Sequence, residues 1–100
     1  MAKVRVILWY RANDEQVREL AETYRTISQE LVGTPGMLSN ELLHSKDEPG
    51  VIMVTSYWES YELLQDWVRS ASHDKTSPLR PYMDRAREHT YETFDVLSAY

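Results

Sequence analysis

Residues 50–73 have the sequence GVIMVTSYWESYELLQDWVRSASH, and this stretch decides the fold. Its first part, Val51 to Trp58, is a short run of apolar and β-branched residues, which predicts a strand. A helical pattern follows without a Gly or Pro between them, and Ser60 is a suitable N-cap because its hydroxyl can accept from the first helical turn. The apolar residues after the cap recur at helical spacing and predict one wide apolar face: Tyr61, Leu63, Leu64, Trp67 and Val68.

The segment before this stretch predicts a strand and a long helix. Val4 to Tyr10 is rich in apolar and aromatic residues, and both of its faces are largely apolar. Asn13 is a good N-cap, and Gln16 completes a capping-box pattern. Apolar residues then recur at helical spacing until Gly33, a residue typical of the position just after a helix. The sequence therefore predicts a helix from Asp14 to Val32.

The next two strands are predicted to form a hairpin. Met37 to His44 is the second strand, and the polar loop Ser45 to Gly50 leads back into Val51 to Trp58 as its antiparallel partner. Strict alternation along the second strand predicts one face made of Leu38, Asn40, Leu42 and His44, and another made of Met37, Ser39, Glu41 and Leu43.

The C-terminal part has weaker patterns. Ser70 to Ser77 is polar and predicted to be irregular. Pro78 and Pro81 argue against a continuous helix, and Pro81 suits the first position of a short helix, Pro81 to Arg87. His89 to Leu97 alternates weakly and is predicted to be the last strand.

The predicted order is β-α-β-β-α-β, in a single domain over residues 1–100. Short connections and a right-handed crossover favour an α+β, ferredoxin-like antiparallel sheet with both helices on one face. The other face then lacks cover, although the first strand is apolar on both sides. Because a domain this small buries only about 60% of its unfolded surface, we expect a homodimer in which a second copy covers that face.

Composition excludes several classes of function. The formal net charge of −5 argues against nucleic acid as a partner, and the absence of Cys removes disulfides, thiolate nucleophiles and Cys-based metal sites. The three His are far apart without metal-ligand spacing, and no Gly-rich turn joins a strand to a helix. No apolar run reaches the ~20 residues of a membrane span, and no signal peptide is visible, so the cytoplasm is the expected location.

Two motifs resemble those of a known family. The pattern Tyr57-Trp58-Glu59-Ser60 at the end of a strand is followed by a helix with Trp67 and then by Ser70-Ala71-Ser72-His73, while Thr34-Pro35-Gly36-Met37-Leu38 precedes the second strand. This arrangement resembles the antibiotic biosynthesis monooxygenase family of small dimeric α+β barrel proteins. The resemblance implies a homodimer and an enzyme that uses O2 with neither metal nor flavin. We also expect no haem, because His73 lies among Ser72, Asp74 and Lys75, a wet setting for an axial ligand.

The resemblance extends to candidate catalytic residues. The quinone-forming members, which act on aromatic polyketides, carry a His, a Trp and an Arg that look like His44, Trp58 and Arg80. Two residues depart from that pattern, because Val54 stands where an Asn is expected and Leu64 where a Tyr is expected. The resemblance therefore covers the site in part.

The three residue types suit the oxidation of a phenol or anthrone. A His can serve as general base, an Arg can stabilise a phenolate or peroxide anion, and a Trp can stack on a fused-ring substrate and donate one hydrogen bond. A deprotonated substrate of this kind is electron-rich enough to reduce O2 itself. The predicted walls of the substrate cavity are Tyr10, Tyr57, Trp67 and Tyr82.

Other readings remain open. His44 could be a half-exposed residue at a strand end, Trp58 a core anchor, and Arg80 a surface ion-pair partner. A haem-binding or haem-degrading relative of the same fold would use a helix Trp and a later His, which Trp67 and His73 could imitate, although the first strand lacks the expected Asn. The third alternative is an accessory protein that binds a small molecule without turnover.

Overall fold

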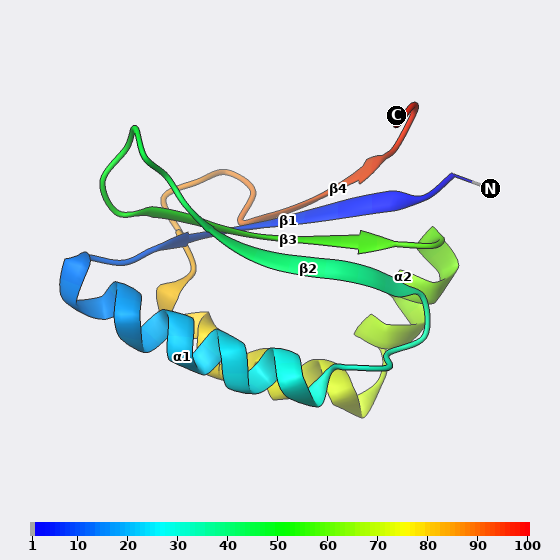
Figure 1. The fold of residues 1–100 in the computed structure, drawn as a ribbon, viewed down its shortest axis with the longest axis horizontal. Coiled ribbons are helices and arrows are strands. Elements are labelled where there is room, and N and C mark those ends of the chain that lie inside the picture. The colour runs from blue at the N-terminus through cyan, green and yellow to red at the C-terminus, as the bar shows by residue number, and fades with distance from the viewer. Residues whose placement is uncertain (1) are drawn as a thin grey trace.

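The computed structural model describes residues 2–100, apart from the side chains of Ala71 and Ser72, and its helices lie on one face of an antiparallel sheet (Figure 1). The strand order is β2-β3-β1-β4, which confirms the ferredoxin-like arrangement. Within the described part of the chain, no helix is long and apolar enough to cross a bilayer. The elements in order are β1 (Val4–Arg11), α1 (Asp14–Glu30), β2 (Met37–His44), β3 (Val51–Trp58), α2 (Tyr61–Val68), the 3-10 helix η1 (Ala71–Tyr82) and β4 (Tyr91–Asp95).

Both helix starts agree with the sequence. The Asn13 side chain accepts from the backbone N–H of Gln16 at 2.9 Å, and the Gln16 side chain accepts from the Asn13 backbone N–H at 3.0 Å, which completes the capping box. The Ser60 hydroxyl accepts from the backbone N–H of Leu63 at 3.3 Å. These bonds fix where α1 and α2 begin, while α1 ends at Glu30, two residues before the predicted end.

The segment after α2 corrects the sequence prediction. A 3-10 helix runs through Ala71–Tyr82 and contains both Pro78 and Pro81, so neither the irregular segment nor the helix from Pro81 to Arg87 is observed. In an α-helix the proline ring clashes with the carbonyl four residues earlier, and the prediction is based on that clash. In a 3-10 helix the hydrogen bonds join residues three apart, so this clash does not exclude proline. Leu79 on this helix is 5% exposed, so burial in the core holds the segment against the sheet layer.

Strand β2 departs from strict alternation. Met37 pairs with Trp58 of β3, and Ser39 pairs with Tyr57, the residue directly before Trp58. Leu38, between Met37 and Ser39, is therefore an extra residue in the ladder. The predicted faces are therefore wrong at the start of the strand, because Met37 lies on the same face as Asn40. This irregularity turns both side chains toward the helices.

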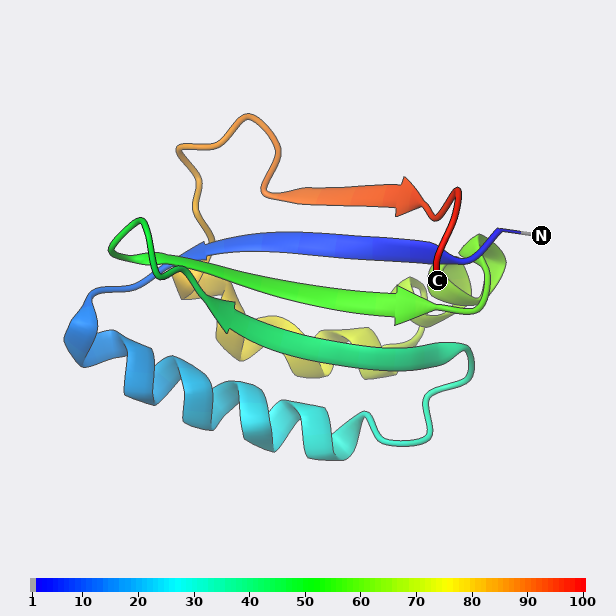
Figure 2. The same ribbon diagram turned by 45° about the horizontal axis from the view of Figure 1, so that its top comes forward.

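The core lies between the sheet and the helices (Figure 2). Trp58 and Leu20 are fully buried there, one from β3 and one from α1. The opposite face of the sheet has no helix over it within the described residues, and half-buried apolar side chains such as Ile7 and Met53 lie on it.

Candidate functional site

A narrow inner cavity lies between the sheet and the helices, with a volume of about 100 Å³. Both layers of the fold supply its mostly apolar walls, which include Val6, Leu8, Val54, Leu64 and Leu79. Among the described residues that line it there is no Lys, Arg, Asp or Glu. Because a charged ligand would lose its hydration there without a counter-charge, the inner cavity suits an uncharged, largely apolar ligand.

Several polar side chains interrupt this apolar wall. Tyr10 and Asn40 come from the sheet, and His73 comes from the 3-10 helix. Tyr24 and Ser28 are four residues apart on α1, so both point from one face of that helix into the inner cavity. Phenol, hydroxyl, amide and imidazole groups are thus available to an oxygen atom of an aromatic ligand.

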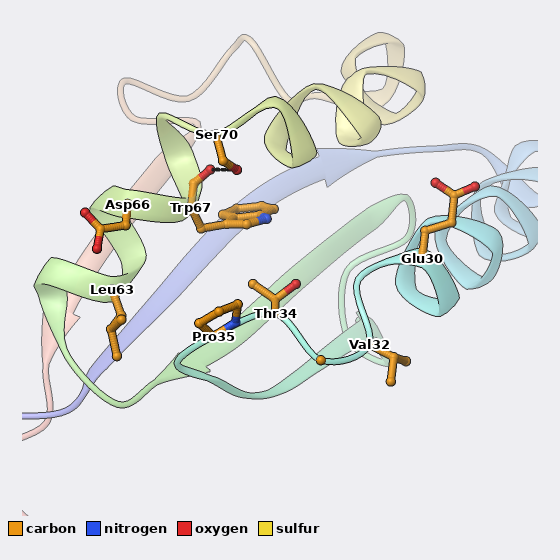
Figure 3. Close-up of a pocket in the computed structure, with 9 residues that line it drawn as sticks. Glu30, Val32, Thr34, Pro35, Leu63, Asp66, Trp67 and Ser70 are labelled. Carbon is orange, nitrogen blue, oxygen red and sulfur yellow. Dashed lines mark hydrogen bonds between the residues drawn. The ribbon is translucent and has the colours of Figure 1, made fainter.

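Trp67 lines both the inner cavity and a larger outer pocket, and Figure 3 shows the outer pocket. The outer pocket has a volume of about 440 Å³ and lies between α2 and the connection from α1 to β2. The Trp67 ring lies 5.4 Å from the ring of Trp58, and His73 meets it edge-on at 4.9 Å. Trp67 is the residue that the two lining sets share.

Burial raises the pKa of both cavity tyrosines above the ordinary value. Loss of hydration on burial, together with a smaller contribution from the neighbouring Tyr24, raises the pKa of Tyr10 to about 12. The pKa of Tyr24 is also raised, first by burial, although the nearby Ser28 hydroxyl lowers it and Glu41 adds to the increase. At neutral pH both phenols therefore keep their protons and can donate hydrogen bonds to a substrate oxygen.

The raised pKa of Tyr10 predicts a loss of stability at alkaline pH. A phenol that resists ionisation in the folded state contributes full stability below about pH 10, the ordinary tyrosine value, and that contribution is lost as pH rises through about 12. Each unit of pKa difference corresponds to about 1.4 kcal/mol. Urea unfolding at pH 8–12 should therefore show a steeper alkaline loss for the wild type than for Tyr10→Phe. Equal slopes would contradict the effect of burial on this phenol.

Trp58 is part of the core of the described chain. Its side chain is fully buried, and its indole N–H donates to the hydroxyl of Ser56 at 2.9 Å. It packs with Val4 and Val6 and does not border the inner cavity. This placement matches the interpretation of Trp58 as a core anchor, and its ring packs against the ring of Trp67.

His44 lies apart from the inner cavity. It is exposed at the end of β2 and borders a separate pocket of about 430 Å³ on the uncovered face of the sheet, together with Trp9 and Arg87. The Arg87 guanidinium lies 3.8 Å from the centre of the Trp9 ring, where it is held by a cation–π contact. His44 and Trp58 therefore do not line a common cavity.

The other expected residues are also dispersed. Arg80 is exposed near the end of the 3-10 helix, and Tyr57 lies on the uncovered face, where Arg5 stacks on it at 4.7 Å. Tyr82 is half-buried against the core. Of the four expected wall residues, Tyr10 and Trp67 line the inner cavity and the other two do not.

Sequence reasoning assigns no role in the inner cavity to Tyr24 or Ser28, and it considers His73 only as a residue that could imitate a haem ligand. The structure places all three of these polar residues in the wall of the inner cavity. The available signal was Ser28, a hydroxyl that follows Ile27 directly on the buried side of α1 and lies one helical turn after Tyr24. Across the described residues, no group of three or more His, Asp or Glu side chains is placed to hold a metal ion.

Comparison with known proteins identifies relatives across most of the chain. The family model described as antibiotic biosynthesis monooxygenase matches residues 3–78. Protein SchA of Streptomyces halstedii is 31% identical over 82% of this chain and 22% of its own length. The 42.8 kDa protein in the whiE locus of Streptomyces coelicolor is 33% identical over 78% of this chain and 20% of its own length. The chain thus spans about a fifth of the length of the curated relatives it matches.

Solved structures share the fold along almost the whole chain. A conserved protein from Methanosarcina mazei Go1 superposes with a TM-score of 0.76 and 18% identity over 94% of this chain and 92% of its own. SnoaB of Streptomyces nogalater, a cofactor-independent oxygenase, superposes with a TM-score of 0.72 and 12% identity over 100% of this chain and 96% of its own. At such identities these matches show a common fold and no more.

Proposed function

The chain belongs to the antibiotic biosynthesis monooxygenase family, and on that premise we propose that it is a cofactor-independent monooxygenase that oxidises a polycyclic aromatic phenol or anthrone with O2. The observation that carries this proposal is an uncharged inner cavity whose apolar wall holds neutral phenols and an imidazole. Such a wall can hold one ring of a fused-ring substrate and still offer a base and hydrogen-bond donors to the reacting oxygen.

The reaction is a four-electron reduction of O2 by the substrate. A base removes a proton from the anthrone, and the resulting anion transfers one electron to O2. The two radicals combine into a carbon–oxygen bond, and the peroxide anion takes back the proton from the protonated base. The resulting hydroperoxide loses water to leave a quinone carbonyl. Anthrone and O2 are thereby converted to anthraquinone and water, so one oxygen atom enters the product and the other leaves as water.

The positions of the side chains suggest their roles. We assign the base to His73, since it is the His that lines the inner cavity, and imidazole suits proton transfer near neutral pH. Tyr10 and Tyr24, as neutral phenols, donate hydrogen bonds to the anion that develops. His44 retains a catalytic role only if the reaction takes place in the pocket that it borders on the uncovered face. Arg80 lines neither that pocket nor the inner cavity.

Substrate size assigns a further role to Trp67. The outer pocket of about 440 Å³ is within the ~300–1,000 Å³ range of sites for drug-sized ligands, whereas the inner cavity is smaller. We propose that the substrate enters through the outer pocket and passes Trp67, whose indole then stacks on its rings. An oxygen electrode with anthrone should record uptake above the protein-free rate, and the same uptake after chelator treatment. Uptake that stops on metal removal would contradict the proposal.

We also propose that the chain forms a homodimer through the uncovered face of the sheet. Apolar and aromatic residues there, such as Ile7, Trp9 and Met53, lack cover from a helix. A stable interface buries more than about 1,000 Å² in total, and this face supplies the kind of surface that such an interface needs.

The dimer predicts a specific response to charge. Ile7→Glu should give a monomer in sedimentation velocity at micromolar concentration, because a carboxylate would be buried at the interface without a partner. Val32→Glu is the matched control, because Val32 is 83% exposed after α1 and lies away from that face. A wild-type chain that sediments as a monomer would contradict the proposal.

A further inference from the structure

We propose that the hydroxyls of Tyr24 and Ser28 and the indole N–H of Trp67 form a binding site for one oxygen atom of an aromatic ligand in the inner cavity. All three polar atoms are buried, and within the described residues none has a hydrogen-bond partner. All three residues line the same cavity. The proposal rests on the proposed function only for the aromatic class of the ligand.

Unpartnered polar atoms of this kind are costly. A buried donor or acceptor without a partner has lost its hydrogen bonds to water and gained none in return, and native proteins contain few such groups. Here three of them, on two different helices, line one cavity. A ligand oxygen that satisfies them removes the cost, which is the physical reason to expect one there.

The positions of the three groups support a shared ligand. Tyr24 and Ser28 lie one turn apart on the same face of α1, and the Ser28 hydroxyl is near enough to influence the pKa of Tyr24 without meeting hydrogen-bond geometry. Trp67 comes from α2, and Figure 3 shows its ring nitrogen on the side away from the α2 backbone. Donors from two elements therefore border one space.

The chemistry of the groups defines the ligand. An indole N–H can only donate, whereas the two hydroxyls can donate or accept. The ligand atom must therefore accept at least one hydrogen bond, as a carbonyl, phenol or phenolate oxygen does. The apolar walls around it and the absence of Lys or Arg among the described lining residues disfavour a carboxylate or phosphate.

Calorimetric titration with phenol and benzene tests the site. These single-ring compounds are the largest probes that suit the inner cavity, because its volume of about 100 Å³ is below the roughly 150 Å³ of a cavity in another protein that holds benzene. In a purely apolar cavity the phenol hydroxyl would lose its hydration without compensation, so phenol would bind more weakly than benzene. We expect the wild type to bind phenol at least as tightly as benzene.

Two variants and a control complete the experiment. Tyr24→Phe and Ser28→Ala should each weaken phenol binding about five- to tenfold and leave benzene binding unchanged, whereas Tyr61→Phe, at an exposed tyrosine of α2, should change neither. Preference for benzene in the wild type, no binding of either compound, or unchanged phenol binding in both variants would overturn the site. Oxygen uptake is a separate readout, so a protein that selects phenol but consumes no O2 would refute the proposed function and leave the site intact.

Discussion

Replacement of Trp58 by alanine is expected to lower the free energy of unfolding by about 3–5 kcal/mol, as is typical when a buried aromatic side chain is removed. Trp58 is fully buried, packs with Val4, Val6 and Leu64, and lies behind the Trp67 ring. The loss is large against the 5–15 kcal/mol that stabilises a typical domain, so much of the chain should unfold under mild urea.

Urea denaturation monitored by circular dichroism measures this effect. Trp58→Phe should cost less than Trp58→Ala, because the aromatic ring remains and only the bond to Ser56 and part of the volume are lost. Tyr61→Ala is the control, since Tyr61 is 47% exposed and its removal should leave stability nearly unchanged. A Trp58→Ala variant that is fully stable but inactive would contradict the structural role of Trp58 and indicate a role in the reaction.

His73→Ala is expected to lower kcat with anthrone by about 10²-fold or more, the usual effect of removing a general base. His73 is half-buried, lies edge-on to Trp67 and lines the inner cavity. His44→Ala is the matched variant, and it should keep near-normal kcat because His44 lies outside that cavity. Steady-state oxygen uptake gives kcat for both.

The opposite result would be equally informative. Loss of turnover in His44→Ala with normal turnover in His73→Ala would move the reaction to the pocket beside Trp9 on the uncovered face. A drop in both variants with reduced stability would indicate damage to folding, so unfolding curves must accompany the rates.

The sequence was sufficient to predict those parts of the fold that local chemistry determines. Asn13 and Ser60 mark the helix starts because each side-chain oxygen accepts a hydrogen bond from a backbone N–H only three residues later. Such a cap depends on neighbouring residues alone and is therefore visible in the sequence. The strand from Val51 to Trp58 has the predicted bounds, because its apolar run ends directly before a capped helix. The element order then leaves few topologies, and the observed one is among them.

Other parts depend on contacts between distant residues. The extra residue at Leu38 shifts the register of β2, and no local sequence pattern predicts this shift. The 3-10 helix around Pro78 depends on the burial of Leu79 against the core. The inner cavity is lined by α1, α2, the 3-10 helix and the sheet together, so Tyr24 and Trp67 could not be paired from their spacing in the sequence.

Labelling with ¹⁸O2 tests the central claim most directly. The purified protein, treated with chelator and supplied only with anthrone and ¹⁸O2, should yield anthraquinone that carries one labelled oxygen, at a rate well above that of heat-denatured protein. This result follows from a single carbon–oxygen bond formed with O2 and the loss of the second oxygen as water. Anthraquinone formed no faster than without protein, or formed with its new oxygen from water, would contradict a cofactor-independent monooxygenase.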